Sequence, residues 1–303
     1  MKKFLFAGLF LLSGLAVGSE QIELSFNPIK DAKYIYRMEM IQNVKNNILG
    51  QNVPLKTELK AMYLMEIMDK TAHETQAQIT FREVTYLLSS SMVRARYNSR
   101  NPLKNPTKMD KTFDKMFDKL IDRPFMVTIA PDGSINSVTG LDDIVEDMLH
   151  VAATDGQMAA LAGATMKRQF GGAAMKNTLE QSLKIYPAST VRMGETWNSE
   201  AAMTLANVNT DFKTTYTLNA VEKDRAVIAI ESDIQVSPGL GMEGKLAGTQ
   251  TGTVIIDTSA GVPLTVDVSQ KAGGSVVVQG INVQMELIGR IKTSLETIEV
   301  LHM

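Results

Sequence analysis

The chain contains no cysteine. This absence excludes disulfide bonds, thiolate zinc sites, iron–sulfur clusters and thiol catalysis. A chain of 303 residues can be stabilised by its hydrophobic core alone, so the absence is compatible with an oxidising compartment. Aromatic residues are also scarce, at 6%, whereas the 19 methionines predict an adaptable, largely aliphatic interior.

The sequence also lacks a strong charge excess and, beyond its first residues, long apolar runs. A formal net charge of -2 gives no reason to expect nucleic acid as a partner. Lys2 and Lys3 precede an apolar stretch at residues 4–17 and small residues at the following positions, which is the order of a secretory signal peptide. The stretch is too short for a membrane span. We therefore predict a signal peptide at residues 1–19 and a periplasmic or secreted protein with no membrane span after cleavage; an uncleaved N-terminal anchor is the alternative.

A period of two in the apolar residues marks the chain after this segment. Within residues 33–48, Tyr36 and Met38 fall on one face and Arg37 and Glu39 on the other. Within residues 55–70, Tyr63 and Met65 share a face with Leu55, Leu59, Ala61 and Ile67, while Lys56, Glu58, Lys60 and Glu66 fall on the other. Because side chains alternate across a strand, each set lies on one face, and the intervening turn residues predict an antiparallel hairpin. Similar strand patterns fill most of the sequence from residue 186 onward.

Helical patterns interrupt the predicted strands. Residues 109–121 carry an apolar stripe at helical spacing, and a second stripe follows at residues 141–149. The stretch 151–185 is rich in Ala, Gly and Met, and we predict helices there at about residues 155–169 and 173–184. Its structural interpretation is a connecting pair of helices over one sheet face; the alternative is a mobile lid over an apolar cavity.

Two pairs of segments resemble each other across the chain. Residues 63–70 share their layout with residues 216–223, and residues 127–138 share theirs with residues 254–266. We interpret this as a diverged duplication, although amphipathic hairpins resemble one another by chance as well. The prediction is an α+β fold with two antiparallel β-rich halves, residues 20–150 and 186–303, which have curved sheets and are connected by the helical segment 151–185.

No arrangement of residues indicates catalysis or metal binding. His73, His150 and His302 have no HExxH spacing, and there is no GxSxG motif. The acids of residues 142–147 lack the EF-hand pattern, and their place at a helix start explains them through the helix dipole. We predict a non-enzyme with no catalytic residue, no metal site and no cofactor.

Two further clusters have structural and functional interpretations. Methionines near residues 38–40 and 62–68 could bind Cu(I), but core packing explains them better, with Met65 and Met68 on opposite strand faces. The basic stretch 92–108 could meet anionic groups, but a solvated edge strand is favoured.

Several motifs in one order resemble a known family. They are residues 63–70, residues 125–138, Met193-Gly194-Glu195-Thr196-Trp197, and Gly248-Thr249-Gln250-Thr251-Gly252-Thr253 with Gly261 downstream. This order resembles an uncharacterised family of exported bacterial proteins that carry a domain of unknown function, which implies no activity. The hairpin around residues 257–261 is more distantly similar to hairpins of periplasmic lipoprotein-carrier folds, in which a curved sheet holds an acyl chain against helices.

These observations lead to a functional hypothesis with one alternative. We predict an envelope protein that binds an apolar or lipid-like ligand in a hollow between sheet and helices, lined by residues such as Tyr36, Met38, Tyr63 and Met65. The alternative is a structural or protein-interaction module of the envelope, with envelope proteins as partners and no small-molecule ligand.

Overall fold

The computed structural model describes residues 21–91, 93–154, 167, 171–205, 208–237, 242–278 and 280–300. The predicted signal peptide and nearly all of the predicted helix 155–169 lie outside these residues. Within them, twelve strands form one sheet in which every strand pair is antiparallel. The prediction of an antiparallel sheet accompanied by helices is therefore confirmed.

The strands before the helical segment are β1 (Ala32–Ile48), β2 (Gln51–Lys70), β3 (Thr75–Ser90), β4 (Arg94–Asn98), β5 (Pro124–Ile129) and β6 (Ile135–Thr139). Those after it are β7 (Thr196–Leu205), β8 (Val208–Glu222), β9 (Arg225–Ser237), β10 (Met242–Asp257), β11 (Pro263–Val278) and β12 (Ile281–Val300). The described helices are α1 (Lys108–Phe117), α2 (Leu141–Thr154) and α4 (Gly172–Leu183).

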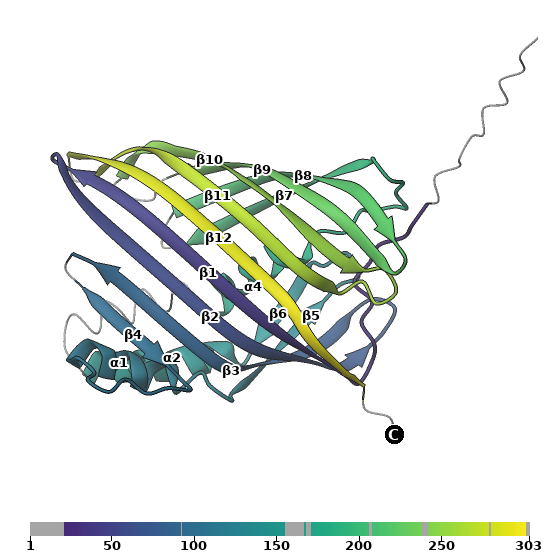
Figure 1. Cartoon of the computed structure of the whole chain (residues 1–303), viewed down its shortest axis with the longest axis horizontal. Helices are drawn as coiled ribbons and strands as arrows, with labels where there is room; N and C mark the ends of the chain where they lie inside the picture. The colour runs from purple at the N-terminus through teal and green to yellow at the C-terminus, as the bar shows by residue number, and fades with distance from the viewer. Residues whose placement is uncertain are drawn as a thin grey trace, which may run out of the picture.

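The first and last strands meet in the middle of the sheet. Its order is β6-β5-β3-β2-β1-β12-β11-β10-β9-β8-β7, with β4 paired to β3 (Figure 1). The predicted hairpin is present as β1 and β2, with Tyr36 opposite Tyr63. On its other side β1 pairs with β12 from Ala32 opposite Val300 to Ile48 opposite Val283. The β-rich regions on either side of the helices thus share one continuous sheet.

Alternation gives this sheet an apolar and a polar face. On β1 and β2 the side chains in register with Tyr36 and Tyr63 face the core, and we call this side the inner face. The outer face carries cross-strand ion pairs, such as Lys60 with Glu39 at 3.1 Å and Arg290 with Asp267 at 2.7 Å. The period of two in the sequence therefore places the hydrophobic residues on the side that the helices cover.

Helix α1 packs its aromatic stripe on the inner face of β3 and β4. Phe113 stacks on Tyr86 at 5.7 Å and Phe117 on Tyr97 at 4.9 Å between ring centroids. A capping box between Thr107 and the third helical residue begins the helix. The predicted stripe is confirmed, but the helix ends at Phe117, well before Pro124.

Helix α4 connects the two edges of the open sheet. It contacts both β6 and β7, the terminal strands of the sheet order. Its first residue, Gly172, donates a backbone hydrogen bond to Asp142 of α2 at 2.9 Å, and Trp197 of β7 donates to the Ile185 carbonyl just beyond its last turn at 3.0 Å. The predicted helix 173–184 is confirmed, and Figure 1 shows it behind the long central strands.

Residues 21–31, the closing segment, cross one end of the sheet. Phe26 donates from its backbone N–H to Pro131 in the β5–β6 turn at 2.7 Å, and Asn27 donates to Ala260 in the β10–β11 turn at 3.1 Å. Gly261 lies directly against this segment: it has a φ of 62°, and a Cβ there would lie 1.6 Å from the Ser25 carbonyl oxygen. We call this the closed end, and the opposite end, where β1 turns into β2 at Gly50, the far end.

Glycines let β10 and β11 approach closely toward the far end. A Cβ built at Gly248 would lie 2.1 Å from the Lys271 carbonyl oxygen, and one at Gly252 would lie 2.3 Å from that of Asp267. Glycines inside strands are typical of sharp bends in a sheet. A side chain at either position would collide with the backbone of β11.

Candidate functional site

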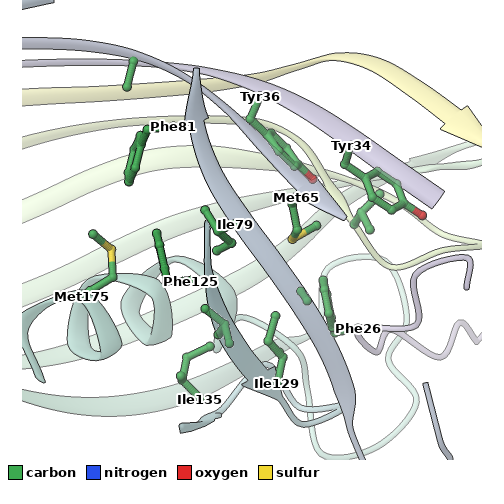
Figure 2. Close-up of a cluster of buried hydrophobic side chains, with 14 of the residues drawn as sticks. Phe26, Tyr34, Tyr36, Met65, Ile79, Phe81, Phe125, Ile129, Ile135 and Met175 are labelled. Atoms are coloured by element: carbon green, nitrogen blue, oxygen red, sulfur yellow. The ribbon is translucent and has the colours of Figure 1, made fainter. Parts of the chain in front are cut away.

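The four predicted ligand-binding residues lie together on the inner face of β1 and β2. Tyr36 and Met65 are buried, at 4% and 5% exposure, and Met38 and Tyr63 are half-buried. The rings of Tyr36 and Tyr63 stack with centroids 5.3 Å apart. Figure 2 shows Tyr36 and Met65 projecting to the side where Phe125 and Ile129 lie. The structure therefore brings the four residues together, while their role as a binding site stays a prediction.

A row of aromatic rings continues from these residues across the sheet. Tyr63 contacts Phe81 of β3 edge to face at 6.0 Å, and Phe81 stacks on Phe125 of β5 at 6.2 Å. Neither phenylalanine was among the site residues predicted from the sequence. Each phenylalanine falls in the apolar alternation of its own strand, so its inward position could be predicted. Nothing in the sequence indicated that β3 would pair with β2 and β5 with β3.

The Tyr36 hydroxyl is buried without a hydrogen-bond partner among the described residues. Burial raises the pKa of Tyr36 well above its ordinary value, and the nearby hydroxyls of Tyr63, Tyr186 and Tyr34 raise it further. The group is therefore a neutral donor over the whole physiological range.

Two neighbouring tyrosines at the closed end are hydrogen-bonded. Tyr34 accepts from the backbone N–H of Ile29 at 2.9 Å. Tyr186, which is buried, donates to the Gly261 carbonyl. Both hydroxyls thus bind the segments that close this end of the sheet, which sets them apart from Tyr36.

A row of polar residues that includes Gln42, Thr57 and Gln270 crosses the inner face, and beyond it, toward the far end, the face is apolar and half-buried. Val44 of β1 lies opposite Leu55 of β2 and Leu287 of β12, and Leu287 lies opposite Ala272 of β11. These four residues, with Met285 of β12 and Leu246 of β10, form a continuous surface that we call the distal inner face. The described residues enclose it less completely than they enclose the closed end.

Two hollows lie beside the edge strand β7. One, of about 190 Å³, lies between α4 and β7, with Glu180 and Lys184 in its lining. The other, of about 600 Å³, extends over β7–β10, where its lining includes Phe212, Ile234 and Gly248. Its volume is within the range of small-molecule sites. None of the four predicted residues lines either hollow, but Gly248 lies opposite Ala272 of the distal inner face.

The remaining candidate groups lie apart from these surfaces. His73 lies in the exposed β2–β3 turn, His150 lies exposed on α2, and His302 is outside the described residues. Asp142 and Asp143 occupy the first turn of α2. Within the described ranges, no three His, Cys, Asp or Glu residues are grouped so that they could hold a metal ion.

The methionines and arginines singled out in the sequence lie where strand packing and an ion pair account for them. Met65 is buried whereas Met68 is 45% exposed, so the two lie on opposite faces as predicted. Arg94 and Arg96 lie on β4, which pairs only with β3 in the described sheet, and Arg96 binds the buried Asp110 at 2.8 Å. No helix among the described residues is long and apolar enough to cross a membrane.

Comparison with known proteins identifies a family. The pattern described as "Family of unknown function (DUF6263)" matches residues 73–263. The chain therefore belongs to this family, which confirms the expectation of an uncharacterised family. No curated protein sequence matches the chain.

Solved structures show a likeness of fold. A structure titled for lipid–protein interactions in lipovitellin aligns with a TM-score of 0.50 and 12% identity, over 92% of this chain and 26% of the lipovitellin chain. OccK7 (OpdD) of Pseudomonas aeruginosa aligns with a TM-score of 0.24 and 6% identity, over 88% of this chain and 99% of that chain, which is too low to support a shared fold. The lipovitellin match spans about a quarter of that chain, so it bears on the fold of the sheet alone.

Proposed function

We propose that this protein binds an apolar or lipid-like ligand against the inner face of its sheet, without catalysing a reaction. The observation that carries the proposal is the distal inner face. Apolar side chains there continue across neighbouring strands, yet the described residues leave them half-buried. Covering such a surface with an apolar ligand contributes about 25 cal/mol per Å² before the costs of association.

The fold and the local composition support the same proposal. Lipovitellin, whose structure is titled for lipid–protein interactions, has a sheet to which this one is similar. Gly248 lines a hollow of about 600 Å³ that extends over β7–β10. Met38 and Met65 at the opposite end of the inner face have unbranched side chains, which adjust to ligands of different shape.

The proposed location follows from the sequence. Residues 1–19 have the order of a signal peptide, so we place the protein in the periplasm or outside the cell. Mass spectrometry of the N-terminus of the protein isolated from its native source tests this location, because a retained Met1 contradicts export by cleavage.

The duplication remains part of the proposal. The β5–β6 pair has a register shift between Thr128 and Ile129, and the β10–β11 pair has one between Ile255 and Ile256. Those positions correspond in the two repeats that the sequence suggests. Superposition of β2, β3, β5 and β6 on β8, β9, β10 and β11 tests common descent, which a failure to overlay these strands would contradict.

Lipid that purifies with the protein tests the binding function. We expect solvent extraction and mass spectrometry to find about one lipid per chain. Leu287→Glu places a charge on the distal inner face and should remove most of that lipid, because burying a carboxylate against an apolar ligand is costly. Ile288→Glu is the matched control, since Ile288 is 39% exposed on the neighbouring, outward-facing position of β12.

The alternative function predicts a different result. A structural or protein-interaction module of the envelope would carry no lipid in the wild-type protein, and Leu287→Glu would not change crosslinking to its partners. Absence of stoichiometric lipid in protein taken from its native compartment would contradict ligand binding.

A further inference from the structure

The unpaired hydroxyl of Tyr36 needs an explanation that packing does not provide. The residue is 4% exposed, and its oxygen has no hydrogen-bond partner among the described residues. More than nine tenths of buried polar groups in native proteins are paired, and an unpaired one is destabilising. Phenylalanine would fill the same space without that cost. Tyrosine at this position therefore indicates that a bound molecule accepts a hydrogen bond from its hydroxyl.

The surrounding groups do not take this role. Tyr34 and Tyr186 have their hydrogen bonds to Ile29 and Gly261 at the closed end. Tyr63 stacks its ring on that of Tyr36 with an angle of 19° between the planes, an arrangement that aligns the rings face to face. Figure 2 shows the Tyr36 oxygen below β1, on the side of the buried cluster.

The chemistry of this environment restricts what could bind there. The groups that act electrostatically on the Tyr36 hydroxyl are the hydroxyls of other tyrosines, and none of these is a cation. A carboxylate or phosphate placed there would lose its hydration without gaining an opposite charge. A neutral oxygen, such as that of an ester carbonyl, accepts a hydrogen bond without this penalty.

The inner face leads from this hydroxyl to the distal inner face. Along β1, Met38 and Met40 follow Tyr36 on the same side, then Gln42 opposite the buried Thr57, and then Val44. The eight residue-to-residue steps from Tyr36 to Val44 span roughly 26 Å at the rise of a β-strand. That length suits a long acyl chain lying along the strand.

We infer that Tyr36 donates a hydrogen bond to the neutral ester oxygen of a lipid whose acyl chain extends along β1 toward the far end. This inference rests on the proposed function and adds the ligand class: a neutral acyl ester in preference to a free fatty acid anion or a plain hydrocarbon.

Three probes with one pyrene-labelled chain test this class. They end in a methyl group, a methyl ester or a carboxylic acid, and each is titrated by fluorescence into the full chain at a pH where the acid is ionised. We expect the wild-type protein to bind the ester about fivefold more tightly than the hydrocarbon, which is the size of one neutral hydrogen bond. The carboxylate should bind more weakly than the ester.

Tyr36→Phe should abolish the preference for the ester over the hydrocarbon. Tyr86→Phe is the matched control, because Tyr86 is also buried on the inner face but packs on α1, and it should keep the preference. Without ligand, thermal unfolding should show Tyr36→Phe to be at least as stable as the wild-type protein. A clear loss of stability would mean that the hydroxyl is already paired, which overturns the inference.

The outcomes separate this inference from the proposed function. Equal binding of ester and hydrocarbon, or tighter binding of the carboxylate, overturns the ester inference while apolar binding stands. If the wild-type protein binds none of the probes and carries no lipid, the proposed function fails and the inference fails with it.

Discussion

Asp110 is a charged side chain in an almost fully buried position. Its side chain is 1% exposed and accepts hydrogen bonds from Arg96 and from the backbone N–H of Thr107. Burial alone would raise the pKa of Asp110, but the hydrogen bonds from Arg96 and Thr107 outweigh it and lower the pKa to about 2. The carboxylate thereby joins β4 to the start of α1.

We expect Asp110→Asn to lower the free energy of unfolding at neutral pH by about 3 kcal/mol, because Arg96 and Thr107 lose their charged acceptor. Urea unfolding measures this loss. Asp147→Asn is the control: its ion pair with Arg123 has a carboxylate that is 56% exposed, and its loss should cost less than about 1 kcal/mol. Equal effects of the two substitutions would contradict a special role for Asp110.

The lowered pKa also predicts a pH dependence. A depressed pKa stabilises the folded state above the unfolded value of 3.8, and this stabilisation is lost as the pH falls toward 2. The wild-type protein should therefore lose about 2 kcal/mol over that interval through this group. The difference in unfolding free energy between wild type and Asp110→Asn should shrink by that amount, and a constant difference would be inconsistent with the lowered pKa.

At the scale of elements, the closing segment depends on a glycine. At Gly261 a Cβ would collide with the Ser25 carbonyl, and the positive φ adds a further cost for any other residue. We expect Gly261→Ala to displace residues 21–31 and to lower the unfolding free energy by about 3 kcal/mol.

Gly50→Ala provides the comparison for that substitution. Gly50 also has a positive φ, of 82°, but a Cβ there meets no atom within 4 Å. Its substitution should cost only about 1 kcal/mol, the conformational term alone. Amide hydrogen exchange should show loss of protection at Phe26 and Asn27 in Gly261→Ala only; unchanged protection there would refute the contact.

The sequence predicts individual elements better than it predicts their neighbours. Alternation at Tyr34, Tyr36 and Met38 identifies β1, and the turn at Leu49 and Gly50 identifies its hairpin partner. Nothing local identifies β12 as the other partner, because pairing across more than two hundred residues leaves no mark on either strand's own pattern. For the same reason the row from Tyr36 to Phe125 could be predicted only at its first two members.

The start of α1 is marked in the sequence. Thr107 and Asp110 have the spacing of a capping box, and they do begin α1. The unpaired hydroxyl of Tyr36 could not be found from sequence, because a tyrosine in an alternating strand looks the same whether or not its oxygen has a partner.

At the scale of the whole molecule, burial affects all 7 tyrosines. Burial is the first cause of a raised pKa at each of them, and at Tyr86 and Tyr216 the pKa rises to about 12. Because these side chains come from both ends of the sheet order, their ionisation is coupled to the integrity of the whole sheet.

We expect a single alkaline transition. A raised pKa keeps its stabilising effect below the unfolded value of 10.0, and that effect is lost as the pH rises from there through about 12. Phenolate absorbance and far-ultraviolet circular dichroism should therefore change together above pH 10. Several tyrosines that ionise while the circular dichroism is still native would contradict their burial. The exposed model compound N-acetyltyrosine amide gives the reference titration.

The pairing of β1 with β12 has a consequence for biogenesis. A ribosome delivers the chain in order, so β1 emerges early and must wait for the strand encoded last before its second edge is hydrogen-bonded. Until then the apolar faces of the hairpins on both sides of this pairing stay exposed to water and to other nascent chains. The second edge of β1 therefore becomes hydrogen-bonded only after β12 has been synthesised, and until then a holding chaperone could act on the stretch from Ala32 to Ile48.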